Sequence, residues 1–136
     1  MASYSIAEMH AIAPFYVSKL KAAGIRSTTK LLQRAATPKL RKELAQATNI
    51  PMRLILDWAN IADLTRVPGI ALDYAELLFA AGVKTVKDLG RRNAATLVAR
   101  MAKISMEKRK VEVLPSEQRV ARWIEAAKSL APGMEY

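Results

Sequence analysis

The sequence predicts an all-α domain built on a duplicated unit, and three observations support this prediction. Residues 12–36 and 70–94 align without gaps at an offset of 58, with 10 identities in 25 positions. Such an internal repeat decides the architecture, so it is considered first. Apolar residues recur at helical spacing in nearly every segment. Finally, 51% of the 136 residues are hydrophobic and none is cysteine, so an apolar core without disulfides suffices for one domain.

The first copy is predicted to contain three helices before a break. Ser5 and Glu8 form a capping-box pattern, which predicts a short first helix. A helix over residues 12–23 then stops at Gly24, because glycine readily adopts the left-handed conformation that ends a helix. A shorter helix over residues 28–36 follows.

The next helix is predicted to start at Thr37 and Pro38. Threonine accepts a hydrogen bond from the first turn of a helix, and proline fits where no backbone donor is needed. Its apolar positions predict that Leu40, Leu44 and Ala47 are buried.

The central segment 52–64 is apolar on almost every side, which is typical of a helix in the middle of a molecule that bridges two halves. In the second copy a helix runs to Ala81 and stops at Gly82, the counterpart of Gly24. Two further helical pieces reach about Lys103, an extended connector follows, and the chain ends with an amphipathic helix.

We therefore expect a single domain whose two copies pack about a pseudo-twofold axis. The predicted organisation is one domain over 1–136, with repeat one at about 5–48, the central helix at about 52–64, repeat two at about 65–104, the connector at 105–115 and the C-terminal helix at 116–131.

The charge balance favours an anionic partner. Lys and Arg number 22 against 12 Asp and Glu, a net charge of +10, and the surplus is concentrated in the two copies. Such a surplus attracts polyanions, although a solvated surface that keeps a small protein soluble is the alternative interpretation. No apolar run reaches the roughly 18–20 residues that span a membrane, and no signal-peptide pattern is present. We therefore expect a cytoplasmic protein with no membrane partner.

The basic residues form two local groups, and the second lies in the region of the second copy that matches the first. If the copies pack about a twofold axis, the groups would form one stripe along a duplex backbone; a charged solvent face is the alternative. The first basic group is Lys30, Arg34, Lys39, Arg41 and Lys42, and the second basic group is Lys84, Lys87, Arg91 and Arg92.

The segment from Leu64 to Leu78 resembles a helix-hairpin-helix motif, with Gly69-Ile70-Ala71 as the tight turn and Arg66 beside it. Glycine lets the backbone turn sharply and approach a ligand closely. The helix that follows offers unpaired N–H groups at its positive end, which suits a phosphate. The resemblance implies binding that is independent of base sequence, because such contacts read only the backbone.

The two turns are not equivalent in sequence. The first is Ala11-Ile12-Ala13, preceded by His10, and it lacks glycine. In the second copy, Asp73 and Glu76 near the helix start favour the helix but repel a phosphate.

The whole chain resembles an uncharacterised bacterial family of tandem helix-hairpin-helix proteins. The resemblance implies the fold but no activity beyond the nucleic-acid binding inferred from the motif. The matching segments are 19–25, Ala36-Thr-Pro-Lys39, 41–45, Ile55 to Trp58, Ala62-Asp-Leu64, 74–78, 80–83, Leu114-Pro115 and Trp123 to Lys128.

Catalysis finds no support in the sequence. The single histidine, His10, falls at a turn and is interpreted as a surface residue, and no metalloprotease, P-loop or nucleophile-elbow motif is present. We expect no metal and no cofactor. Trp58, Trp123 and the paired Tyr16 and Tyr74 lie on apolar faces and are predicted to be core. With 6% aromatic residues, base stacking on single strands is not expected.

The sequence thus predicts a non-catalytic protein that binds DNA or another structured nucleic acid through phosphate contacts. The alternative is a protein-interaction or self-assembly module, in which the hairpins serve packing alone and the partner is another protein or a second copy of the chain.

Overall fold

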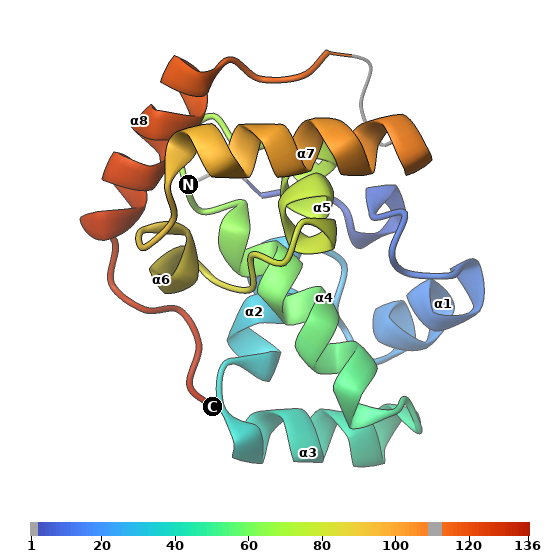
Figure 1. Ribbon diagram of the computed structural model, residues 1–136. Coiled ribbons are helices and arrows are strands. Elements are labelled where there is room, and N and C mark those ends of the chain that lie inside the picture. The colour runs from blue at the N-terminus through green and yellow to red at the C-terminus, as the bar shows by residue number, and fades with distance from the viewer. Residues whose placement is uncertain (1–2, 109–112) are drawn as a thin grey trace.

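The computed structural model describes residues 3–108 and 113–136. Over these residues the regular structure is helical, apart from a single bridge between Ser5 and Ser27, so the all-α prediction is confirmed (Figure 1). The elements, in chain order, are the 3-10 helix η1 (Ile6–Glu8) and the helices α1 (Pro14–Ala22), α2 (Thr28–Ala35), α3 (Pro38–Thr48), α4 (Met52–Leu64), α5 (Leu72–Ala80), α6 (Val86–Leu89), α7 (Ala94–Lys108) and α8 (Glu117–Lys128).

Helix α4 runs through the middle of the molecule. Helix α3 lies across one end of the molecule and α7 lies across the opposite end (Figure 1). It packs against α2 and α3 of the first half and against α5 of the second. Its bounds are those predicted from the sequence, and Ile55, Trp58 and Leu64 on it are buried. The central helix therefore joins the two halves through one apolar core.

The two copies end their first long helix in the same way. Gly24 and Gly82 have φ angles of 86° and 99°, in the left-handed region. The N–H of the next residue, Ile25 or Val83, bonds back to the carbonyl five residues earlier, at 2.9 and 3.0 Å. This closure needs a left-handed residue, which glycine adopts without steric cost. The predicted stops are confirmed.

The helices that follow these stops start on hydroxyl caps. The side chains of Ser27 and Thr85 each accept a hydrogen bond from the N–H three residues on, both at 3.1 Å. Thr37 does the same for α3 at 3.2 Å, as predicted. These caps fix where α2, α3 and α6 begin.

Each copy also packs a tyrosine against a tryptophan. The ring centroids of Tyr16 and Trp58 are 5.5 Å apart, and those of Tyr74 and Trp123 are 5.3 Å apart. Both tryptophans are buried, as predicted, and Trp58 Nε1 donates to the carbonyl of Ala11 at 3.2 Å. Thus α8 covers the second copy as α4 covers the first.

The buried face of α3 differs from the prediction. The structure buries Arg41, Leu44 and Thr48, whereas Leu40 is half-buried and Ala47 is exposed. Polar side chains can line this face because their donors have partners: the Thr48 hydroxyl donates to the carbonyl of Leu44 at 2.7 Å. The buried residues of α3 thus follow the spacing i, i+3, i+7 that starts at Arg41, and of the three residues predicted to be buried only Leu44 belongs to this face.

Other helix bounds differ from the prediction by a few residues. Helix α1 starts at Pro14 and not at Ile12, since proline suits the first helical position. Helix α7 continues to Lys108, into the predicted connector, because residues 94–108 include neither glycine nor proline. Residues 109–112 of that connector lie outside the described residues.

A buried carboxylate ties the last residues to the rest of the fold. Asp63 accepts from Arg66 Nη1 and from the N–H of Val86, both at 2.8 Å, and Arg66 Nη2 donates to the carbonyl of Ala131 at 2.6 Å. A Cβ on Gly133 would lie 2.5 Å from Asp63 Oδ1. Only glycine fits there, and the Asp63–Arg66 pair therefore positions the segment 129–136 against α4 and α6.

We predict that Gly24→Ala lowers the free energy of unfolding by about 1–2 kcal/mol, the cost of a left-handed conformation for a residue with a Cβ. A Cβ there meets no atom within 4 Å, so backbone strain is the only cause. Urea denaturation measures the change. Gly90→Ala is the control, because Gly90 has a helical φ of −60° and should show no decrease. Equal decreases at both positions would contradict this explanation.

Candidate nucleic-acid interface

Arg41 of the first basic group is buried and has a structural role. It is 3% exposed, and its two terminal nitrogens donate to the carbonyls of Ala35 and Glu135 at 2.8 and 2.7 Å. Burial lowers the pKa of Arg41, while the nearby Tyr136 acts in the opposite direction. The assignment of Arg41 as a phosphate contact is therefore corrected: it holds the segment 129–136 against the corner between α2 and α3.

Arg34 and Arg92, which match in the repeat, also bind their own chain. Arg34 Nη1 donates to the carbonyl of Ala23 at 3.3 Å, and Arg92 Nη2 donates to that of Gly82 at 2.8 Å. The Arg34 guanidinium thus caps the end of α1 and the Arg92 guanidinium caps the end of α5, where a positive charge is favourable. Arg66 is likewise committed to Asp63. The half-buried arginines of the predicted site are structural.

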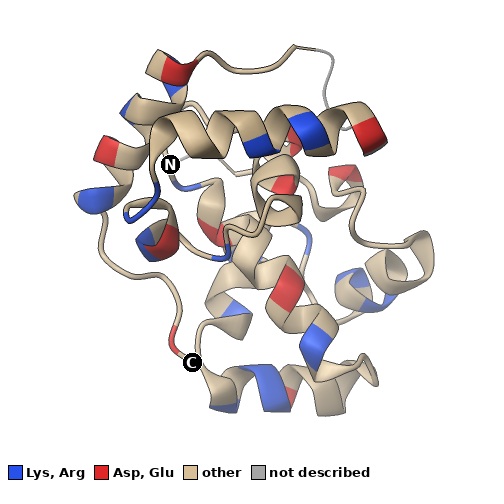
Figure 2. Cartoon of the chain, viewed as in Figure 1, with Lys and Arg blue, Asp and Glu red and all other residues tan. Residues whose placement is uncertain are grey.

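The remaining predicted cations are exposed, and within the described residues none of them forms an ion pair. Figure 2 shows the basic residues of α3 and those near α6. We call these side chains the exposed cations: Lys30 on α2, Lys39 and Lys42 on α3, Lys84 before α6, Lys87 on α6, and Arg91 after it.

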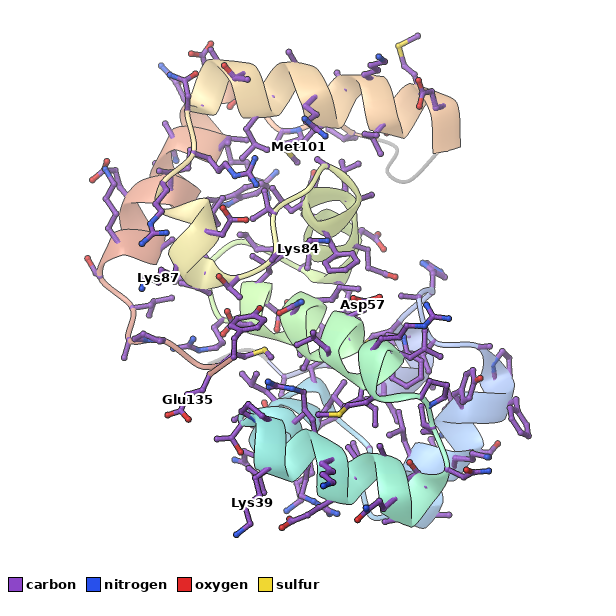
Figure 3. All side chains as sticks on the ribbon, turned by 60° about the horizontal axis from the view of Figure 1, so that its bottom comes forward. Lys39, Asp57, Lys84, Lys87, Met101 and Glu135 are labelled. Carbon is purple, nitrogen blue, oxygen red and sulfur yellow. The ribbon has the colours of Figure 1, made fainter. Side chains whose placement is uncertain are left out.

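Three exposed cations surround one hollow in the surface. A groove of about 390 Å³ lies between α4 and α6, which we call the α4–α6 groove, and Figure 3 shows Lys84 and Lys87 on its α6 side and Asp57 on α4. A second cavity of about 310 Å³ adjoins it and shares Thr85, Lys87 and Tyr136. The full lining of the groove is Leu56, Asp57, Asn60, Lys84, Thr85, Lys87, Asp88, Arg91 and Tyr136.

The charge in the α4–α6 groove is positive. Burial alone would raise the pKa of Asp88, but hydrogen bonds from Arg92 and from the N–H of Lys84 outweigh it and lower that pKa. The ionised Asp88 is paired with Arg92 at 3.1 Å. The lining side chains thus carry three cations against two carboxylates, Asp57 and Asp88.

The segment 129–136 lies between Lys39 of the first basic group and Lys87 of the second (Figure 3). The N–H of Glu135 donates to the carbonyl of Ala36 at 2.7 Å, beside the start of α3, and Tyr136 lines the groove with Lys87. Figure 3 shows Glu135 between Lys39 and Lys87. Lys30 and Lys42 line neither cavity. Tyr136 is not predicted from the sequence, because no local pattern marks a residue that docks over such a distance along the chain.

The turn before α1 already holds an anion, and this anion belongs to the chain. The N–H groups of His10 and Ala11 donate to the carboxylate of Glu76 at 3.3 and 2.8 Å. Glu76 lies on α5 in the second copy and is buried, whereas the imidazole of His10 is exposed, as predicted, with Nδ1 3.6 Å from Glu76. A phosphate cannot use these donors while Glu76 occupies them.

The turn before α5 is also poorly suited to a phosphate. The N–H of Ile70 donates to the carbonyl of Val67 at 3.1 Å, and Trp123 Nε1 would be 3.1 Å from a Cβ on Gly69. A groove of about 410 Å³ adjoins Ala71 at the start of α5, and its two carboxylates oppose an anion. Its lining is Tyr4, Glu8, His10, Ala71, Leu72 and Asp73.

One group of side chains within the described ranges has the residue types of a cation site. Ligand atoms of His10, Asp73 and Glu76 lie within 4.8 Å of one another. Each Glu76 oxygen already accepts one backbone N–H group, which leaves it one further lone pair for an ion.

Comparison with known proteins gives a family but no activity. The model of the domain of unknown function DUF4332 matches residues 10–130. The chain belongs to this family. No curated protein and no solved structure matches it. The DUF4332 match includes both copies and the six exposed cations, while Tyr136 follows it. Of the helices described, none has the length and apolar character needed to cross a membrane.

We predict that Glu76→Ala destabilises this DUF4332 domain by about 2–3 kcal/mol, because two N–H groups are left without their charged acceptor. Thermal unfolding measures the change. Added formate should raise the melting temperature of the variant more than that of the wild type, since a small carboxylate can occupy the vacated position. The exposed Asp73→Ala is the matched control and should change stability little. If formate affects variant and wild type alike, the anion interpretation of the turn is wrong.

Proposed function

We propose that the chain binds nucleic acid independently of base sequence, through phosphate contacts, and that it catalyses no reaction. The observation that carries this proposal is the set of exposed cations, which come from both halves and form no ion pair within the described residues. Lysine and arginine side chains that neutralise phosphates release counterions, and this supplies affinity without sequence information. DNA and structured RNA both present such a backbone.

We further propose that each copy is a helix-hairpin-helix unit whose turn organises the fold. Support comes from the recurrence of the glycine stop, the capping arginine and the tyrosine–tryptophan pair at equivalent places. In this proposal the phosphate contacts come from the helix faces and not from the turns. Glu76 occupies the first turn, and Asp73 lies at the start of the helix after the second.

We predict that Lys84→Glu and Lys87→Glu each weaken binding to a mixed-sequence duplex, and by the same factor for unrelated sequences. For each phosphate that a variant no longer neutralises, the log–log dependence of affinity on salt should become shallower by about 0.9. Fluorescence anisotropy of a labelled duplex at several salt concentrations measures both quantities.

The matched control is Lys103→Glu on α7, an exposed residue at the opposite end of the molecule from α3 (Figure 1). It changes the net charge equally and should have a smaller effect. An equal effect would show that only net charge matters. A wild-type protein that shifts no duplex anisotropy at low salt would overturn duplex binding.

The second candidate is a protein-interaction or self-assembly module, and exposed apolar side chains favour it. Phe15 on α1 is 64% exposed, and Met52 at the start of α4 is 40% exposed. The Lys19 ammonium lies 4.8 Å from the centroid of the Phe15 ring. An exposed aromatic ring of this kind suits a contact with another protein surface, including a second copy of the chain.

If this module self-assembles through α1, Phe15→Ser should shift light-scattering mass from an oligomer toward the monomer. The substitution removes exposed apolar area and should leave stability nearly unchanged. A wild-type mass equal to the monomer at every concentration would exclude self-assembly.

A further inference from the structure

Tyr136 differs from the other tyrosines and the tryptophans of the described chain in its exposure. It is 65% exposed, whereas Trp58 and Trp123 are 2% and 3% exposed and Tyr16 and Tyr74 are half-buried. A partly exposed aromatic residue at the rim of a groove has surface available to a ligand.

The Tyr136 ring is nevertheless held in place. Its hydroxyl donates to Asn60 Oδ1 on α4, and the guanidinium carbon of Arg41 lies 5.8 Å from the ring centroid. Burial raises the pKa of the Tyr136 hydroxyl and the Asp63 carboxylate raises it further, so the hydroxyl stays protonated and able to donate near neutral pH. The backbone beside it is bound at Glu135. A ring fixed before binding loses little conformational entropy when a ligand stacks on it.

The groove that Tyr136 lines carries three cations, together with the carboxylates of Asp57 and Asp88. Lys84, Lys87 and Arg91 line the same α4–α6 groove as Tyr136. The other exposed aromatic ring, Phe15, lines none of the cavities described above, and the one cation described over it is Lys19. A stacking surface next to several cations is the combination that binds single-stranded nucleic acid.

We propose that the α4–α6 groove binds an unpaired nucleotide of a single-stranded nucleic acid. The base stacks on the Tyr136 ring, and the adjacent phosphates contact Lys84, Lys87 and Arg91. The groove of about 390 Å³ falls in the range of small-ligand sites, roughly 300–1,000 Å³. The inference rests on the proposed nucleic-acid binding and adds which form of nucleic acid this groove takes.

Duplex DNA does not satisfy both parts of this site. Its bases are stacked on one another, so a ring at the protein surface reaches a base face only where the strand is unpaired. The low aromatic content that argued against single-strand binding concerns long stacking platforms, whereas one fixed ring suffices for one base.

The test compares Tyr136→Leu with the wild type by fluorescence anisotropy, using a labelled mixed-sequence single strand, the same strand with abasic sites, and the matching duplex. Stacking of one base contributes about 1–3 kcal/mol. Tyr136→Leu should therefore weaken single-strand binding roughly 5- to 150-fold, change duplex binding less than about twofold, and reduce the difference between the base-bearing and abasic strands. Tyr136→Phe keeps the ring and should retain most of the affinity.

Two controls separate stacking from damage to the fold. Phe15→Leu removes the other exposed ring and should leave single-strand affinity unchanged. The melting temperature of each variant shows that it is folded under the binding conditions.

The outcomes distinguish the two proposals. If Tyr136→Leu weakens single-strand and duplex binding equally, or if the abasic strand binds the wild type as tightly as the base-bearing one, the stacking site is wrong while phosphate binding stands. If the wild type binds neither strand nor duplex at low salt, both proposals fall. Competition by polyglutamate is a further test. If polyglutamate displaces the single strand, and if Tyr136→Leu weakens polyglutamate binding as much as single-strand binding, the groove binds an acidic protein segment instead.

Discussion

The hydrogen bonds that the buried Asp63 carboxylate accepts are the interaction on which the candidate surface depends. A buried carboxylate is costly unless its oxygens are satisfied, and here Arg66 and the N–H of Val86 satisfy them. These partners come from the end of α4 and the start of α6, so one group sets the distance between the walls of the α4–α6 groove. Through Arg66 it also fixes the segment that carries Gly133 and Tyr136. The candidate surface is thus positioned from inside the molecule.

The residues that the two copies share serve the fold, and those in which they differ supply the proposed function. Arg34 and Arg92 occupy equivalent positions, and each caps the helix that ends at the glycine stop of its copy. In contrast, the position of Lys87 in the groove is Thr29 in the first copy. Duplication therefore preserved the helix stops and caps, while in our proposal the phosphate contacts are concentrated around α6. The DUF4332 match spans both kinds of residue.

The sequence predicts what depends on neighbouring residues. The bounds of α4 and the stop at Gly24 follow from apolar periodicity and from the conformational freedom of glycine, and both are observed. The burial of Arg41 was not predictable, because charge normally implies exposure and one of its acceptors, the Glu135 carbonyl, is 94 residues away. The exposure of Tyr136 depends on the same distant contact. For Arg34 and Arg92, in contrast, the sequence does contain a signal. Both follow the glycine stop of their copy at the same distance, and this repetition indicates a shared structural role.

The contact between Glu76 and the turn before α1 has no counterpart at the equivalent residue of the first copy. At the equivalent position of the first copy stands Ser18, whose hydroxyl donates to the carbonyl of Pro14 within its own helix. The turn of the first copy therefore uses an acceptor that lies 65 residues beyond Ala11, and among the described residues Ser18 makes no matching contact with the turn before α5. On the ribosome, the amino-terminal half emerges with two amide groups that only water can satisfy until α5 has been synthesised. Although its sequence looks like two modules, the first half has its full set of hydrogen bonds only when the second half is in place.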